Sequence, residues 1–238
     1  MDNFLVLGLE TATSCGGVSL SRGGVTDFRL LTECIAQPDI THSRRLMGSV
    51  QWAMEAAGVK WEDLDGIGVS IGPGSFTGLR IGLASAKAIA MATGKPLVGV
   101  PTLQALALAC SGVENGRAVG VLLDARKKEV YAGFFRLDQQ QGAVPTGEPR
   151  VIPPHTLLQE IKEPVTLVGP GVAAYRELFS GHKHIDLLPD FLSLPRAAYV
   201  GMLAAQMLSE GDSMDPASLS PLYVRASEAE LNLKKKSK

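Results

Sequence analysis

The chain has 238 residues, 45% of them hydrophobic, with 23 Lys and Arg against 24 Asp and Glu and a formal net charge of −1. This length and composition suffice for one large domain or two small ones and exclude disorder over most of the chain. The balanced charge excludes the broad basic footprint of an autonomous nucleic-acid binder, so any contact with nucleic acid is predicted to be made through another molecule.

The sequence predicts neither a targeting signal nor a disulfide framework. The three cysteines are odd in number and far apart, without the C-x-x-C spacing of zinc or redox sites, which favours a reducing compartment. Asp2 and Asn3 stand where a signal peptide would be basic, and charges interrupt the most apolar helical stretch, Leu79–Ala92. We therefore expect a cytoplasmic protein without membrane contact.

The first sixty residues predict three strands and a helix. Phe4–Leu9 is a short apolar run typical of a buried strand, and Gly17–Ser21 and Val25–Leu31 flank a Gly-Gly turn, as in a hairpin. Apolar residues then recur at three- and four-residue spacing, which indicates an amphipathic helix with Thr41 as its N-cap and Gly58 at its end.

Strands and helices alternate in the next segment. Gly66–Ile71 and Pro96–Val100 are predicted strands on either side of a helix over Phe76–Thr93, which Gly94 ends. The order βββαβαβ indicates the crossovers of a partly parallel sheet.

The second half repeats this order in a shorter form. After a helix around Thr102–Ser111, strands are predicted at Ala118–Leu123 and Val130–Leu137, and an acidic residue ends the first strand of each half, at Glu10 and Asp124. This weak internal repeat indicates duplication. The remaining expected elements are a low-complexity loop at Gln139–Pro149, a strand at Val165–Val168, and helices at Ala173–Phe179 and Pro195–Ser209, the last with Pro in its first turn.

A glycine-rich run, Gly72-Pro-Gly-Ser-Phe-Thr-Gly-Leu-Arg80, joins a predicted strand to a helix. Backbone N–H groups at such a junction can bind an anion, but the run lacks the Gly-Lys-Ser/Thr ending of a P-loop and the G-x-G-x-x-G spacing. The spacing favours a tight structural turn, with a nucleotide contact as the alternative. The residues concerned are Gly72, Gly74, Ser75, Thr77, Gly78 and Arg80.

The helix after this run carries two rows of small residues, which allow close approach of neighbouring elements. One face is expected on the sheet and the other is available to a partner helix, with burial of both faces inside the chain as the alternative. The rows are Gly78, Gly82, Ala86 and Ala90, and Ala84, Ala88 and Ala92.

Candidates for autonomous chemistry are few. Glu10 and Asp124 are candidates for holding a magnesium ion between two lobes, and solvated strand-end carboxylates are the alternative. His182-x-His184 lacks a third ligand at a supporting spacing and is predicted to be a surface loop. Neither a G-x-S-x-G elbow nor a cysteine nucleophile signature is present, so we expect no intrinsic metal or cofactor. The four lysines between positions 234 and 238 indicate a basic tail, which is either solvated or in contact with RNA phosphates.

The run Ile71–Leu83 closely resembles the signature of the TsaB (YeaZ) family. The resemblance extends over nearly the whole chain and is weakest between about residues 139 and 195. It also covers Leu7–Thr13, His42-Ser43, Leu123–Arg126, Glu129–Tyr131 and Pro221–Arg225. It implies an actin-like α/β fold of two ribonuclease H-like lobes, with mixed sheets flanked by helices and a reduced second lobe.

The resemblance also implies a division of the chain. The first lobe is expected at residues 1–104 and is completed by a C-terminal helix at about 195–225. The second lobe is expected at 105–194, and residues 226–238 form a disordered basic tail.

The family resemblance implies a function in making threonylcarbamoyladenosine beside the tRNA anticodon. The chain is then a non-catalytic subunit that dimerises with and activates a catalytic paralogue, TsaD, together with an ATPase, TsaE. ATP and magnesium are expected at the level of that complex, and tRNA is reached only through it. The alternatives are an actin-like small-molecule kinase or ATPase and a metal-dependent, glycoprotease-like enzyme.

Departures from the catalytic paralogue support the non-catalytic interpretation. The paralogue's metal-binding His-x-x-x-His corresponds to Thr102 and Leu106 here, and neither replaces an imidazole as a ligand. The acidic residue of its first phosphate loop falls at Ser14.

The family pairing surface implies that the helices at about His42–Ala57 and Thr77–Ala92 bind the paralogue, and a second copy when the chain is alone. The predicted interface residues are Leu46, Met47, Val50, Met54, Ile81, Ala84, Ser85 and Ala88.

Overall fold

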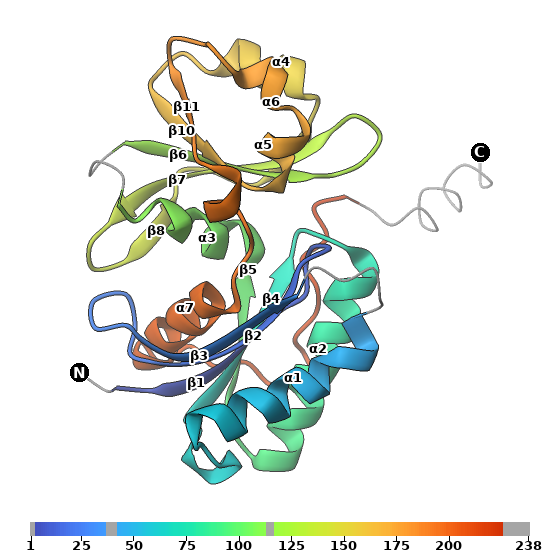
Figure 1. Cartoon of the computed structure of the whole chain (residues 1–238), viewed down its shortest axis with the longest axis vertical. Coiled ribbons are helices and arrows are strands. Elements are labelled where there is room, and N and C mark those ends of the chain that lie inside the picture. The colour runs from blue at the N-terminus through green and yellow to red at the C-terminus, as the bar shows by residue number, and fades with distance from the viewer. Residues whose placement is uncertain (1–2, 37–41, 113–116, 226–238) are drawn as a thin grey trace, which may run out of the picture.

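A computed structural model shows two α/β lobes stacked along the long axis of the molecule (Figure 1). It describes residues 3–36, 42–112 and 117–225, and the side chains of residues 42–44 are not among those described. The N-cap predicted at Thr41 and the basic tail predicted at 226–238 lie outside these ranges.

The first lobe is built on a five-stranded mixed sheet in the order β3-β2-β1-β4-β5. β1 pairs antiparallel with β2 and parallel with β4, and all six of its residues are buried. The strands are β1 (Leu5–Glu10), β2 (Gly16–Arg22), β3 (Arg29–Ala36), β4 (Gly66–Gly72) and β5 (Leu97–Pro101).

Helices cover both faces of this sheet. α1 (His42–Ala57) and α2 (Phe76–Thr93) lie on the outer face, and α7 (Ala197–Ser209) lies on the face turned toward the second lobe (Figure 1). A short 3-10 helix, η1 (Trp61–Asp63), precedes β4.

The second lobe has a six-stranded sheet in the order β11-β10-β6-β7-β8, with β9 paired to β7. Its helices have seven residues or fewer, against 16 in α1 and 18 in α2, so this lobe is reduced in its helices rather than in its sheet. The strands are β6 (Ala118–Asp124), β7 (Val130–Asp138), β8 (Gly142–Pro145), β9 (Arg150–Ile152), β10 (Val165–Val168) and β11 (Ile185–Leu187). The helices are α3 (Thr102–Ala107) with η2 (Leu108–Cys110), α4 (Pro154–Glu160), α5 (Pro170–Ala174) and α6 (Arg176–Phe179), and η3 (Asp190–Leu192) follows β11.

The two sheets share one topology. Strands β8-β7-β6-β10-β11 of the second lobe match β3-β2-β1-β4-β5 of the first, with the same alternation of antiparallel and parallel pairs. The predicted internal repeat is therefore confirmed.

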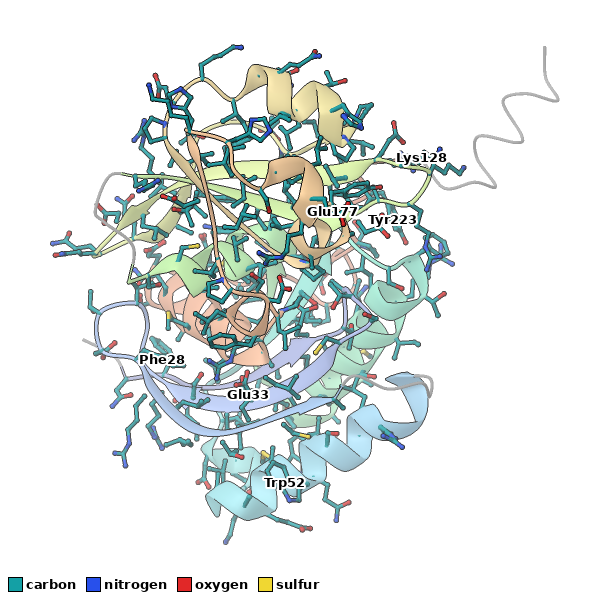
Figure 2. All side chains as sticks on the ribbon, turned by 45° about the horizontal axis from the view of Figure 1, so that its top comes forward. Phe28, Glu33, Trp52, Lys128, Glu177 and Tyr223 are labelled. Carbon is teal, nitrogen blue, oxygen red and sulfur yellow. The ribbon has the colours of Figure 1, made fainter. Side chains whose placement is uncertain are left out.

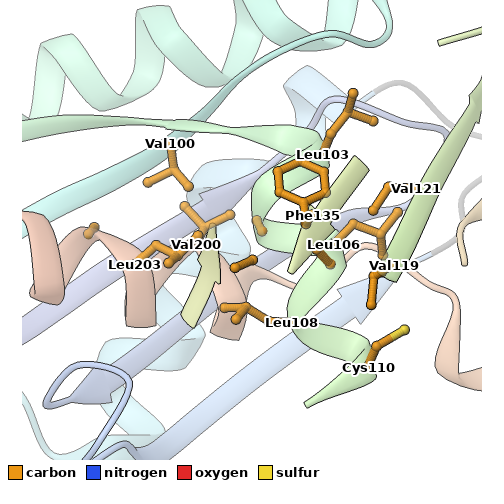
Figure 3. Close-up of a cluster of buried hydrophobic side chains, with 14 of the residues drawn as sticks. Val100, Leu103, Leu106, Leu108, Cys110, Val119, Val121, Phe135, Val200 and Leu203 are labelled. Carbon is orange, nitrogen blue, oxygen red and sulfur yellow. The ribbon is translucent and has the colours of Figure 1, made fainter. Parts of the chain in front are cut away.

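The lobes share a hydrophobic core, in which α3 and α7 lie between the two sheets (Figure 3). Val100 of β5 and Val121 of β6 are both fully buried in it, together with Leu106 of α3 and Val200 of α7. Burying a side chain of this size stabilises the fold by about 1.5–3 kcal/mol, so the two lobes stabilise each other.

Several predicted boundaries are wrong. The second strand of the first hairpin begins at Arg29 rather than Val25, because a turn intervenes in which the Asp27 carboxylate accepts the Gly24 N–H at 2.9 Å. The predicted loop at 139–149 contains β8, and the helix predicted at 173–179 is broken at Tyr175, where φ is −127°.

The last helix also differs from its prediction. It begins at Ala197 because Arg196 is extended, with φ −125°, and the Glu33 carboxylate accepts the Ala198 N–H at 2.9 Å in place of a local cap. It ends at Ser209, so residues 210–225 are not helical.

Residues 210–225, which we name the C-terminal strap, run along the first lobe. The Met214 N–H donates to the Leu97 carbonyl at 2.9 Å, and the Leu222 N–H donates to the Ile71 carbonyl at 2.7 Å. In the described part of the chain, no helix combines the length and the apolar character needed to cross a membrane.

Candidate functional site

An interlobe cavity of about 640 Å³ lies where the start of α2 faces the turn between β6 and β7. First-lobe residues that line it include Thr13, Ser75 and Phe76, and second-lobe residues include Asp124 and Arg126. The C-terminal strap reaches the same cavity through Tyr223 and Arg225.

Close contact with residues 11–12 accounts for two glycines of the signature run. A Cβ atom at Gly74 would lie 2.2 Å from the Ala12 carbonyl oxygen, and one at Gly78 would lie 2.0 Å from the Thr11 carbonyl oxygen. The Ser75 N–H donates to the Ala12 carbonyl at 2.6 Å, and its side chain caps α2 by accepting the Gly78 N–H. These contacts favour the structural interpretation of the run.

The other predicted residues of the signature run lie at different depths. Thr77, like Gly74 and Ser75, lines the cavity, whereas Gly72 and Gly78 are buried and do not line it. Arg80 is exposed and donates through Nε to the Tyr223 hydroxyl at 3.2 Å.

Glu10 and Asp124 do not form the interlobe pair that the sequence suggested. Glu10 is 1% exposed, does not line the cavity, and accepts the Ala12 N–H at 2.6 Å. Burial raises the pKa of its carboxyl group to about 7, against the opposing effect of the hydrogen bonds from Ala12 and Ser70. Asp124 does line the cavity, where it accepts the Arg126 N–H at 2.8 Å.

Metal-ligating groups do not gather in the described part of either lobe. Within residues 3–36, 42–112 and 117–225, no cluster of three or more His, Cys, Asp or Glu side chains is placed to bind a metal. Thr102 and Leu106 are each 1% exposed, and the Thr102 hydroxyl accepts the Gly72 N–H at 3.0 Å, so it supports the signature run from below.

The turn between β6 and β7 has an unusual backbone. Arg126, Lys127 and Lys128, which we name the cationic turn, have φ angles of 59°, 54° and 61°. A left-handed conformation costs a residue with a side chain about 1–2 kcal/mol, so neighbouring contacts must hold the turn. Arg225 provides them, since its Nη1 donates to the Ala125 carbonyl at 3.0 Å and its guanidinium forms an ion pair with Glu129.

Two exposed aromatic rings line the same cavity. Phe76 and Tyr223 stack with ring centroids 5.4 Å apart, and the Arg80 guanidinium lies 3.9 Å from the Phe76 centroid.

The sequence alone did not predict that Tyr223 and Arg126 line one cavity. The motifs that contain these two residues were identified separately, and about 100 residues lie between them. None of the three residues in the cationic turn is glycine, so its backbone conformation left no signal in the sequence.

A second hollow, the helix groove, lies between α1, α2 and η1 and has a volume of about 860 Å³. Met47 and Met91 expose 48% and 77% of their surface near it, on α1 and α2. The groove is lined by Met47, Trp61, Glu62, Ala84, Ser85, Ala88, Ile89, Ala92 and Thr93.

Three of the residues predicted for the partner surface are buried. Leu46, Val50 and Met54 are at most 6% exposed and pack in the first-lobe core, so they are not available to a partner. Ile81 is partly buried against the same core, whereas Ala84 and Ala88 are exposed.

The two rows of small residues on α2 therefore have different roles. Gly78, Gly82, Ala86 and Ala90 are buried on the sheet side, and Ala84, Ala88 and Ala92 are exposed. Burial of both rows within the chain, the alternative for this helix, is wrong.

Two lobes of identical sheet topology around a shared cavity define an α/β protein of the actin-like class. In agreement, the structure superposes on an inorganic polyphosphate/ATP-glucomannokinase from Arthrobacter sp. strain KM with a TM-score of 0.52 at 13% identity, over 88% of this chain and all of that one. This likeness establishes the fold alone.

Closer relatives place the chain within this class. Residues 36–233 match the family model of TsaD, tRNA N6-adenosine threonylcarbamoyltransferase. The tRNA threonylcarbamoyladenosine biosynthesis protein TsaB of Escherichia coli strain K12 is 27% identical over 227 residues, which are 92% of this chain and 94% of the relative. YeaZ from Pseudomonas aeruginosa superposes with a TM-score of 0.77 at 25% identity, over 94% of this chain and all of that one. The chain belongs to the TsaB (YeaZ) proteins of the TsaD family.

Proposed function

We propose that this chain is a non-catalytic subunit required for threonylcarbamoylation of the tRNA adenosine beside the anticodon. It pairs with a TsaD-like catalytic paralogue, acts in the cytoplasm together with a TsaE-like ATPase, and leaves ATP and magnesium chemistry to the complex. Near full-length similarity to relatives named for tRNA threonylcarbamoyladenosine biosynthesis supports this role.

The helix groove is the observation that carries the proposal. Its floor is formed by exposed alanines of α2, and Met47 and Trp61 on its walls expose 48% and 37% of their surface. Small residues allow a helix backbone to approach closely, and an apolar hollow of this kind on a water-soluble surface marks a protein interface.

The buried residues of α3 support a non-catalytic role. Thr102 is engaged by the Gly72 N–H, and Leu106 lies in the core shared by both lobes. Neither side chain is an effective metal ligand, and both are buried and do not line the interlobe cavity.

Co-purification with the paralogue tests the proposed pairing. Ala88→Glu places a charge in the groove and is expected to abolish capture of the paralogue, because an unpaired carboxylate would be buried in the interface. Ala173→Glu, on an exposed position of α5, is the matched control and should leave capture unchanged. Equal capture by both variants would place the pairing surface elsewhere.

A small-molecule kinase or ATPase is the second candidate, favoured by the interlobe cavity and by Asp124 on its wall. The chain alone, incubated with ATP and magnesium, separates the two functions. Hydrolysis that disappears in Asp124→Asn would support the enzyme, and no hydrolysis above the buffer rate is expected for a non-catalytic subunit.

A further inference from the structure

The cationic turn presents three positive charges at one point of the surface. Arg126, Lys127 and Lys128 are consecutive and exposed, and Lys128 lies on the same side of the molecule as Tyr223 (Figure 2). The chain as a whole has a net charge of −1, so this concentration of charge is local.

The two carboxylates that flank the turn in the sequence contact a backbone N–H group of the turn and Arg225. Asp124 accepts the backbone N–H of Arg126, and Glu129 is paired with Arg225. The acidic neighbours in the sequence therefore hold the backbone of the turn, and Arg225 fixes it from the C-terminal strap. A strained backbone held in this way is characteristic of a functional surface.

The exposed aromatic pair, Phe76 and Tyr223, lines the interlobe cavity. Phe76 and Tyr223 are each 41% exposed, and both line the cavity together with Arg126 and Lys127. Cations that bind phosphates beside aromatic rings on which bases stack are the combination that binds single-stranded RNA. An acidic protein partner would also contact exposed aromatic rings and cations, so the test below separates such a partner from RNA.

We propose that the cationic turn and the Phe76–Tyr223 pair contact a single-stranded segment of the tRNA substrate directly. The inference rests on the proposed function and differs from the expectation that tRNA is reached only through the paralogue.

Binding of unmodified tRNA to the reconstituted complex of chain, paralogue and ATPase tests the cationic turn. Replacing Arg126 and Lys128 by Gln should weaken binding and reduce the slope of log affinity against log salt by about 1.4, since each phosphate contact on a single strand contributes about 0.7. The matched control replaces Lys162 and Lys183, which are exposed and do not line the cavity, by Gln. This control should keep the wild-type slope.

The aromatic pair is tested separately. Tyr223→Leu removes a stacking surface and should weaken tRNA binding by at least about fivefold, whereas Tyr223→Phe keeps the ring and should bind within about twofold of wild type. If both variants bind tRNA with the wild-type dissociation constant, the proposed contact between the aromatic pair and tRNA is wrong.

The outcomes distinguish this inference from the proposed function. A wild-type complex that fails to modify tRNA would contradict the proposed function itself. A complex that modifies tRNA, but whose affinity and salt slope are unchanged by the Gln substitutions, would overturn only the direct contact. Loss of ATPase-subunit binding by these variants with unchanged tRNA affinity would also overturn it, and would assign the turn to a protein partner.

Discussion

The Glu10 carboxyl group is buried at the end of β1 and does not line the interlobe cavity. It is 1% exposed, and it accepts the Ala12 N–H at 2.6 Å. Ala12 in turn accepts the Ser75 N–H, so the carboxyl group supports the loop on which the signature run rests. Its protonation is therefore linked to the stability of the first lobe.

Glu10→Gln should change the pH dependence of unfolding. Burial raises the pKa in the folded state from 4.5 to about 7, so the folded protein binds more protons than the unfolded chain between these values. The stability due to this group is therefore greatest below pH 4.5 and declines as pH rises through 7, by on the order of 3 kcal/mol. Gln keeps an acceptor for Ala12 without a charge.

Urea unfolding of both proteins at several pH values between 5 and 8 measures this difference. The variant should lose less stability than wild type over the range. Parallel stability curves for the two proteins would show that Glu10 does not titrate there.

Gly78→Val should destabilise the fold rather than remove a ligand contact. A Cβ atom would lie 2.0 Å from the Thr11 carbonyl oxygen, so α2 would have to move from the end of β1, at a cost of about 3 kcal/mol. Gly74→Val should act in the same way against Ala12. At Gly48 of α1 an added Cβ meets nothing within 4 Å, and the same substitution there should change stability by less than about 1 kcal/mol.

Thermal denaturation of the purified variants compares these glycines. A Gly78→Val protein that melts like wild type but has lost activity in the complex would reassign the run to ligand binding.

At the scale of elements, α2 shows where local sequence determines structure. Its predicted range, Phe76–Thr93, is confirmed because Ser75 caps its start and Gly94 ends it with a φ of 70°. The start of α7 was less predictable, because the group that satisfies its N-terminus is Glu33, on a strand 165 residues away from Ala198. Signals within one turn can be read from the sequence, and signals supplied by tertiary contacts cannot.

The candidate site follows the same division. The apolar spacing of α1 identified a hydrophobic stripe, but it did not separate Val50, which is fully buried, from Met47, which is 48% exposed. That separation depends on where the β-sheet and α2 lie against the helix. The resemblance implied a partner surface on this pair of helices, and only the packing separates the residues that face outward from those in the core.

Self-association through the helix groove is the prediction that belongs to these elements. An unpartnered apolar groove with small residues will pair with its own copy, so the protein alone should be a dimer. Ala84→Glu or Ala88→Glu should weaken that dimer at least about tenfold, because the interface would bury a charge. Sedimentation equilibrium gives the dissociation constants, and an unchanged value for both variants would place the dimer contact elsewhere.

At the scale of the whole molecule, the lobes are joined by more than one connection. α3 and α7 fill the space between the sheets, and the C-terminal strap binds the first lobe through Leu222 and the second through Arg225. A body joined in this way is expected to hold the helix groove and the cationic turn at fixed positions relative to each other. Such rigidity suits a subunit that binds one conformation of its partner more tightly and so favours that conformation.

The final prediction concerns the division of labour between the chains. Alone, this protein should transfer no threonylcarbamoyl group to tRNA, and it should be required when the paralogue and the ATPase are present. Thr102→His and Leu106→His together should not create activity, because both positions are buried, neither lines the cavity, and Thr102 is engaged by the Gly72 N–H. Incorporation of labelled threonine into unmodified tRNA measures each mixture. Substantial incorporation by this chain without the paralogue would show that it carries the transfer chemistry itself.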